Sequence, residues 1–186
     1  RMRWGAQRVE FVRPLQWVLM LFGNEVVPGD ILGIPTGDTT RGHRFHSEGL
    51  IKVTDVNDYE HILLEQGKVI ADYAQRKEKI RQGVEAAAKE NNGIAVIDEA
   101  LLDEVASLNE WPVPLVGKFD ERFLEVPTEA LISSMKEHQK YFHMLDEKGG
   151  MMPNFITLAN IESKDPQQVI EGNERVIRPR LSDAAF

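Results

Sequence analysis

The sequence contains no cysteine, which excludes disulfide bonds, thiolate zinc sites and cysteine nucleophiles. It also lacks a long hydrophobic run. The most continuous apolar stretch, Trp17 to Phe22, is far shorter than the roughly 20 residues that a membrane-spanning helix needs, and it lacks the flanks of a signal peptide. We therefore expect a soluble protein of the cytoplasm.

Several motifs of well-defined chemistry are missing as well. The sequence has no GxxxxGK[ST] phosphate loop, no GxGxxG, no HExxH, no GxSxG and no EF-hand loop. Scattered acidic residues such as Asp120 and Glu121 form no pair whose spacing indicates general acid and base catalysis. Nucleotide chemistry within this chain is therefore unsupported.

What remains is an ordinary globular composition. The 186 residues are 42% hydrophobic and 28% charged, which excludes disordered, collagen-like and coiled-coil proteins. We expect a single domain. The chain opens at Arg1 rather than at a methionine and stops at Phe186, inside an expected helix, so we take it for an internal piece of a longer protein.

Charge is distributed unevenly along the chain. The net charge of −8 argues against nonspecific nucleic-acid binding by the whole surface. Residues 1–46, however, hold six arginines against four acidic residues, and residues 171–186 hold three of each, so residues 47–170 carry −10. Any phosphate contact should therefore come from the two ends that carry arginines, with help from His43 and His46 near the first.

The pattern of apolar residues and turn signals predicts the α+β class, with a mostly antiparallel or mixed sheet flanked by helices. Pro179 is expected to interrupt or kink the last helix, and the proline-rich segment 111–114 indicates a linker or sheet edge. The two helices within about 74–108 are expected as an inserted hairpin, and the segment at about 165–186 should lead into the next domain. The expected helices are 55–66, 74–91, 98–108, 127–138 and 165 onward; the expected strands are 17–22 (buried), two pieces within 25–34, 44–46, 50–53, 115–119, 141–145 and 154–160, with a loop at 35–42.

The densest group of chemically active side chains is TTRGHRFH at 39–46. In an extended segment His43 and His46 would point to opposite faces, which disfavours a shared metal ion. Two interpretations stay open. Either Arg41, Arg44 and His46 meet phosphate or an acidic partner while Phe45 anchors the strand in the core, or the histidine is buried and internally hydrogen-bonded beside surface arginines.

A second group lies in GNERVIRPRLSDAAF at 172–186. Arg175 and Arg178 are three residues apart and share a helix face, and Arg180 follows; together they suit a phosphate or carboxylates. The alternative is a set of internal salt bridges to Glu171, Glu174 and Asp183. A third group contains His138 and His143, whose spacing of five across an expected helix end matches no standard ligand or triad geometry.

Seven strings run in order through nearly the whole chain: MRWG (2–5), FVRPLQW (11–17), TTRGHRFH (39–46), EWPVPLVGKFD (110–120), HQKYF (138–142), PNFITLANI (153–161) and GNERVIRPRLSDAAF (172–186). In this order they resemble the bacterial glycyl-tRNA synthetase beta subunit family. Members of that family are much longer, which agrees with a fragment.

The resemblance implies a noncatalytic role. In the family two alpha and two beta chains form the enzyme. The alpha chain carries the class II active site and uses ATP and magnesium to charge tRNA with glycine, whereas the beta chain supplies tRNA binding. The expected partners are thus the alpha subunit, glycine tRNA and other beta-subunit domains, with no cofactor in this fragment. No catalytic residue is carried over, because the motifs present are not those that form the adenylate.

The resemblance also suggests a fold similar to the editing-type domain of the phenylalanyl-tRNA synthetase beta chain. This raises a second hypothesis, a hydrolytic editing site that clears mischarged tRNA, for which His43 or His46 with Thr39 or Thr40 are the local candidates. A third is a pure interaction module that docks the alpha chain or braces neighbouring domains. In the leading hypothesis, Arg41, His43, Arg44, His46, Arg175, Arg178 and Arg180 are the candidate residues for contact with tRNA or a partner.

Overall fold

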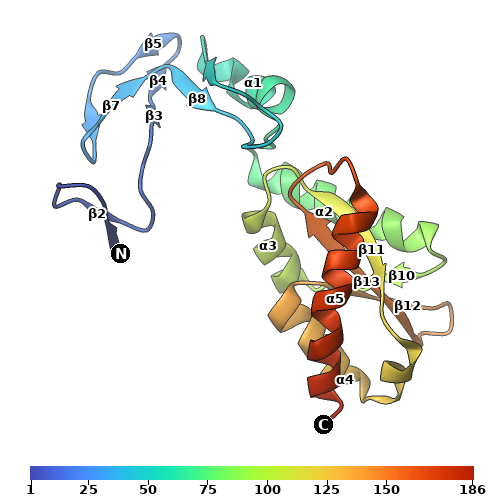
Figure 1. Ribbon diagram of the computed structural model, residues 1–186. Helices are drawn as coiled ribbons and strands as arrows, with labels where there is room; N and C mark the ends of the chain where they lie inside the picture. The colour runs from blue at the N-terminus through green and yellow to red at the C-terminus, as the bar shows by residue number, and fades with distance from the viewer. The chain divides into compact units, whose positions relative to one another are not determined.

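The computed structural model describes residues 1–186 and divides into two compact units, Arg1–Ala71 and Asp72–Phe186 (Figure 1). We call them the N-terminal and C-terminal units and describe each by itself. The single domain expected from the sequence stays a prediction beside this division into two compact units. No helix in either unit combines the length and the apolar character needed to cross a bilayer.

The N-terminal unit is built from very short strands. Gly23, at a φ of +63°, makes the turn within one hairpin, and Leu32 and Gly33, at +52° and +83°, make the turn within another. The antiparallel pairs are β1 (Met2–Arg3) with β2 (Glu10–Phe11), β4 (Leu21–Phe22) with β5 (Glu25–Val26), β6 (Asp30–Ile31) with β7 (Ile34–Gly37), and β8 (Thr39–Arg41) with β9 (Leu50–Lys52); β3 (Val18–Leu19) pairs with β7 in parallel.

Three expectations for this unit are wrong. The segment 17–22 forms two short strands that are at most half-buried, and Phe22 is 83% exposed. Most of the expected loop 35–42 is extended, because β8 pairs with the correctly predicted strand β9. Residues 44–46 form a turn instead of a strand, since Ser47 N–H donates to the carbonyl of His43 at 3.0 Å and folds the chain back.

The predicted helix at 55–66 is present as three consecutive helical turns, namely η1 (Val56–Asp58), α1 (Tyr59–Ile62) and η2 (Leu63–Gly67). The Asp55 carboxylate begins it by accepting from Asn57 N–H at 2.8 Å. It ends at Lys68, whose φ of +52° turns the chain out of the helix. The core of this unit is small and consists of four buried apolar side chains, Ile51, Val53, Leu63 and Ile70.

The C-terminal unit contains a four-stranded antiparallel sheet in the order β10-β12-β13-β11. The predicted hairpin is confirmed as β12 and β13 around the turn at 146–150. Pro114 lies in an edge strand, as the proline-rich sequence predicts, because an edge position tolerates a missing N–H donor. The strands are β10 (Ile94–Ala95), β11 (Val113–Lys118), β12 (Phe142–Leu145) and β13 (Met151–Ala159).

Helices cover both faces of this sheet, which gives three layers (Figure 1). Neighbouring residues of β13 point to opposite faces, so Ile156 packs with α2 (Tyr73–Glu90) and α3 (Glu99–Leu108). Phe155 packs with the helices of the other layer. These are η3 (Glu121–Glu125), α4 (Thr128–Ser133), η4 (Ser134–Gln139) and α5 (Pro166–Ala184).

The helix boundaries in this unit follow their capping residues. Asp98 accepts from Leu101 N–H at 2.9 Å, and Asp165 accepts from Gln168 N–H at 3.2 Å, with proline at the first position of α5. Of the two effects expected of Pro179, an interruption is wrong, because α5 continues through this residue, and a kink stays a prediction. The missing donor of this proline leaves only one carbonyl of the preceding turn without a helical partner.

Many acidic residues of the central region are already paired inside this unit. Lys77 Nζ lies 2.6 Å from Asp103 and 3.2 Å from Glu99, and Arg81 lies 2.7 Å from Glu99. These hydrogen bonds join α2 to α3 and lower the pKa of both carboxyl groups. Helices α2 and α3, which were expected as an inserted hairpin, therefore form a layer of the C-terminal unit. Their ion pairs also neutralise part of the negative charge of residues 47–170.

Candidate functional site

The first candidate site is the segment 39–47, which we call the arginine loop. Its first three residues are strand β8, residues 44–46 form a turn, and its backbone lies against the end of η2. His43 N–H donates to the carbonyl of Gly67 at 2.6 Å. This bond attaches the loop to the end of η2.

Two glycines make this attachment possible. A Cβ atom on Gly42 would lie 2.4 Å from both Cα and O of Gly67, a separation that backbone atoms do not tolerate. Glycine is therefore required at position 42 for the loop to lie directly on the backbone of η2. The close approach fixes where the flanking arginines emerge.

The two histidines of the loop lie together. His43 is only 2% exposed, and its Nδ1 accepts from Phe45 N–H at 3.1 Å. Its ring stacks on His46 with a centroid distance of 4.6 Å. The expectation that the two rings point to opposite faces is wrong, because it assumed a strand where the chain makes a turn. Residues 1–186 contain no group of three or more His, Asp or Glu side chains arranged to hold a metal ion.

Phe45 does not anchor the core. Its side chain is 71% exposed, which corrects the expectation for this residue. The Arg44 guanidinium carbon lies 5.7 Å from the centroid of its ring. Of the two interpretations left open for this segment, the structure confirms the second, a buried and internally hydrogen-bonded histidine beside surface arginines. Contact of Arg41, Arg44 and His46 with phosphate or an acidic partner stays a prediction.

A hollow of about 500 Å³ lies beside the loop. Arg41 and Arg44 on its rim are exposed and form no ion pair with any carboxylate. Trp17 closes one side and donates from Nε1 to the Thr40 hydroxyl at 3.0 Å. Two guanidinium groups beside a polar hollow suit a phosphate or carboxylate group. The lining residues are Gln16, Trp17, Arg41, Gly42, Arg44, Ser47 and Gly49.

The second candidate site is the group of arginines on α5, namely Arg175, Arg178 and Arg180. All three are exposed. Arg175 and Arg178 lie on neighbouring positions of the helix surface, whereas Arg180 lies on the other side of the buried stripe formed by Ile177 and Leu181. None of the three forms an ion pair in the structure.

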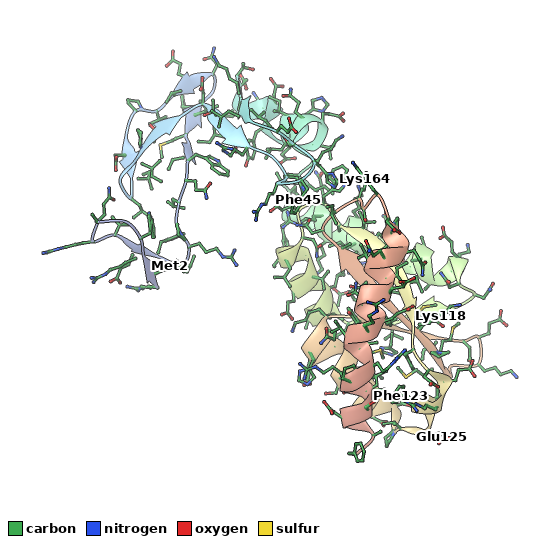
Figure 2. All side chains as sticks on the ribbon, in the orientation of Figure 1. Met2, Phe45, Lys118, Phe123, Glu125 and Lys164 are labelled. Atoms are coloured by element: carbon green, nitrogen blue, oxygen red, sulfur yellow. The ribbon has the colours of Figure 1, made fainter.

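The internal salt bridges offered as the alternative for these arginines are therefore absent. Glu174, one of the expected partners, instead accepts from Lys118 N–H at 2.9 Å and ties α5 to the edge strand β11. Figure 2 shows Lys118 and Phe123 lying beside α5. The charges of the three arginines thus remain available to an external anion.

The third group of residues is structural. His138 lies in η4 and His143 in β12, where burial lowers the pKa of the His143 imidazole. Between them Tyr141 donates from its hydroxyl to the Asn173 side chain at 2.6 Å. Burial raises the pKa of Tyr141 to about 12. This hydrogen bond attaches the start of β12 to α5 and gives the group no catalytic arrangement.

Sequence reasoning missed three residues that shape the first site: Gln16, Trp17 and Gly67. Each is distant in sequence from the arginine loop, and only the fold brings it there. The strings FVRPLQW and TTRGHRFH both mark the site, but no spacing rule joins them. The apolar pattern assigns Trp17 to a buried strand and gives no sign of its place beside the hollow.

Comparison with known proteins covers the whole chain. The family model described as glycyl-tRNA synthetase beta subunit matches residues 1–186. The chain is 63% identical over 186 residues to the glycine–tRNA ligase beta subunit of Hahella chejuensis, 62% over 187 to that of Marinobacter nauticus and 56% over 185 to that of Klebsiella pneumoniae. Each alignment covers 100% of this chain and 27% of the relative.

Proposed function

The chain belongs to the glycyl-tRNA synthetase beta subunit family, and from this premise we propose that it is a noncatalytic region that binds tRNA and helps to assemble the ligase. The activity it serves is ATP-dependent charging of tRNA with glycine. Its partners are the alpha subunit, glycine tRNA and other domains of the beta subunit. ATP and magnesium are used by the alpha subunit, in the cytoplasm.

The arginine loop is the observation that carries the proposal. Arg41 and Arg44 project at the hollow with no carboxylate partner, in a chain whose net charge is −8. Exposed arginines left unpaired among so many acidic residues are available to a phosphate, and phosphate contacts supply most of the affinity of a nucleic-acid site. Gly42 and Gly67 hold the loop in place, so little ordering cost opposes binding.

Part of the acidic surface is already neutralised by internal ion pairs. Asp98, Glu99 and Asp103 are held in ion pairs within the C-terminal unit. The three exposed arginines of α5 offer further cationic groups, for a partner subunit or for RNA. We assign them to the same overall task of assembly and binding.

No observation favours the editing hydrolase. His43 is buried and its Nδ1 is used by Phe45, while the hydroxyl of Thr40 is buried and accepts from Trp17. A hydrolytic site needs a group that can position water beside the aminoacyl end, and His43 and Thr40 are engaged within the fold. Of the other two candidates, His46 stacks on His43, and a role for Thr39 stays untested. The likeness to the editing-type domain of the phenylalanyl synthetase stays a prediction.

The test uses the complete enzyme, with both subunits present. The double variant R41A/R44A should bind tRNA at least about tenfold more weakly, and the slope of log K against log salt concentration should flatten by roughly 0.7–0.9 for each phosphate that the variant no longer neutralises. The matched control is R3A/R122A, which removes two arginines already paired with Glu10 and Asp120. A slope unchanged from wild type contradicts direct contact at the loop.

A second variant separates the two tasks. R175A/R178A/R180A should either reduce tRNA affinity with a flatter salt dependence or reduce copurification with the alpha subunit when RNA is removed. The first result assigns the α5 arginines to tRNA and the second assigns them to assembly. Wild-type behaviour in both assays contradicts any role for these arginines.

A further inference from the structure

Phe45 is exposed at the tip of the arginine loop, and its neighbours distinguish it from other exposed apolar residues. Single apolar side chains on a surface are common, and Phe22 in the same unit is even more exposed, at 83% against 71%. Phe22 pairs in register with Glu25 on a hairpin. Phe45, in contrast, follows an unpaired arginine beside a polar hollow.

The ring and the cationic groups form one continuous surface. The Arg44 guanidinium carbon lies 5.7 Å from the Phe45 ring centroid, and Arg44 also lines the hollow with Arg41 and Ser47. A flat apolar group bound against the ring would therefore lie beside the Arg44 guanidinium, which lines the hollow together with Arg41. A nucleotide has both a flat base and a phosphate.

The backbone holds this surface in one conformation. Phe45 N–H is bonded to Nδ1 of the buried His43, whose own N–H is bonded to Gly67. The His43 ring also lies 6.2 Å from the Phe45 ring. The turn is therefore ordered before any ligand arrives, which reduces the entropic cost of binding.

We propose that Phe45 stacks on the base of an unpaired nucleotide of RNA while Arg41 and Arg44 hold its phosphates. The proposal deepens the function given above and rests on it, because it specifies which part of an RNA this site takes. Bases in a duplex are already stacked on each other and present no free face, whereas unpaired bases stack on aromatic side chains and arginine planes. An acidic protein segment would use the arginines but gain little from the ring, so RNA is the better fit.

The decisive variant is Phe45→Leu in the complete enzyme, which keeps an apolar side chain of similar size and removes the aromatic face. It should weaken binding of the glycine tRNA transcript about tenfold. The salt slope should stay at the wild-type value, because stacking releases no counterions. Phe45→Trp should restore the affinity, and an RNA duplex without unpaired bases should bind F45L and wild type alike.

Phe22→Leu is the matched control, since it makes the same change at an exposed position of the same unit. If F45L binds tRNA as wild type does while R41A/R44A binds weakly, the stacking site is refuted and the proposed function survives. If neither variant changes affinity or slope, both are refuted. If F45L weakens copurification with the alpha subunit but the enzyme that does assemble keeps full tRNA affinity, Phe45 contacts protein, and the stacking site is again refuted.

Discussion

The two units differ in how they use their apolar side chains. Of the 23 buried hydrophobic residues, 19 lie in the C-terminal unit and four in the N-terminal unit. Of the 19 large hydrophobic side chains that are exposed, 13 lie in the N-terminal unit. Burial of apolar surface is the main source of folding free energy. The C-terminal unit is therefore the stable scaffold, and the N-terminal unit leaves more of its large apolar side chains exposed.

The same contrast appears in the charges. The C-terminal unit joins its helices through ion pairs such as Lys77 with Asp103 and Lys136 with Asp98. The arginine loop of the N-terminal unit leaves Arg41 and Arg44 unpaired. A surface rich in exposed apolar side chains and unpaired arginines is typical of a binding region. This contrast supports the recognition role proposed for the arginine loop, and the unpaired arginines of α5 are an exception to it within the C-terminal unit.

The largest expected effect is on the core of the scaffold. Phe155 is fully buried and stacks on Tyr141 at a centroid distance of 4.5 Å. Phe155→Ala should lower the free energy of unfolding of the C-terminal unit by about 3–5 kcal/mol, because it leaves a cavity. Urea denaturation followed by circular dichroism measures this change. The exposed residue Phe22 gives the comparison: Phe22→Ala should change the free energy of unfolding of the N-terminal unit by less than about 0.5 kcal/mol. Equal losses for the two variants would contradict the difference in burial between the units.

A smaller effect is expected at the glycine contact of the arginine loop. Gly42→Ala should cost about 1–3 kcal/mol in the N-terminal unit, because the added methyl group overlaps the backbone of Gly67. It should also weaken tRNA binding while every arginine is retained. Gly172→Ala is the control: it meets nothing within 4 Å on an exposed turn of α5, and should stabilise that helix by roughly 0.5–1 kcal/mol. Wild-type tRNA affinity for G42A would contradict a fixed loop.

The smallest expected effect is on how the stability of the C-terminal unit depends on pH, through the carboxyl group of Asp98. The hydrogen bond from Lys136, together with the N–H group of Leu101, holds the pKa of Asp98 below its usual value. A depressed pKa contributes stability above the unfolded pKa, about 3.9, and this contribution is lost as the pH falls through the folded pKa.

Asp98→Asn keeps the helix cap and removes the charge. It should lower the free energy of unfolding at pH 7 by about 0.5 kcal/mol, and the difference should shrink as the pH falls below about 3.9. Thermal denaturation of both proteins between pH 2 and 7 measures it. A difference that is constant across this range would rule out the charge as its source.

Much of the C-terminal unit could be predicted from sequence because its signals are local. The apolar side of α2 repeats Ile80, Val84 and Ala88 at helical spacing, and the acidic caps at Asp98 and Asp165 define where helices begin. The turn at 146–150 marks its hairpin in the same way. Local patterns of this kind correspond directly to secondary structure.

The N-terminal unit resisted prediction because its determinants are distant in sequence. The turn at 44–46 depends on Gly42 lying against Gly67, and the hollow depends on Trp17 reaching Thr40. The residues next to Phe45 in the sequence do not indicate whether its side chain is buried or exposed. The pattern of residues therefore indicated which segment holds the candidate side chains, but it did not predict how the two histidines are arranged.

The most direct test of the recognition role proposed for the arginine loop is hydrogen exchange of the complete enzyme, measured by mass spectrometry with and without glycine tRNA. The account predicts that tRNA slows exchange in peptides covering residues 39–50, while the sheet peptides of β12 and β13 exchange as before. Unchanged exchange at residues 39–50, with protection confined to the sheet of the C-terminal unit, would contradict it.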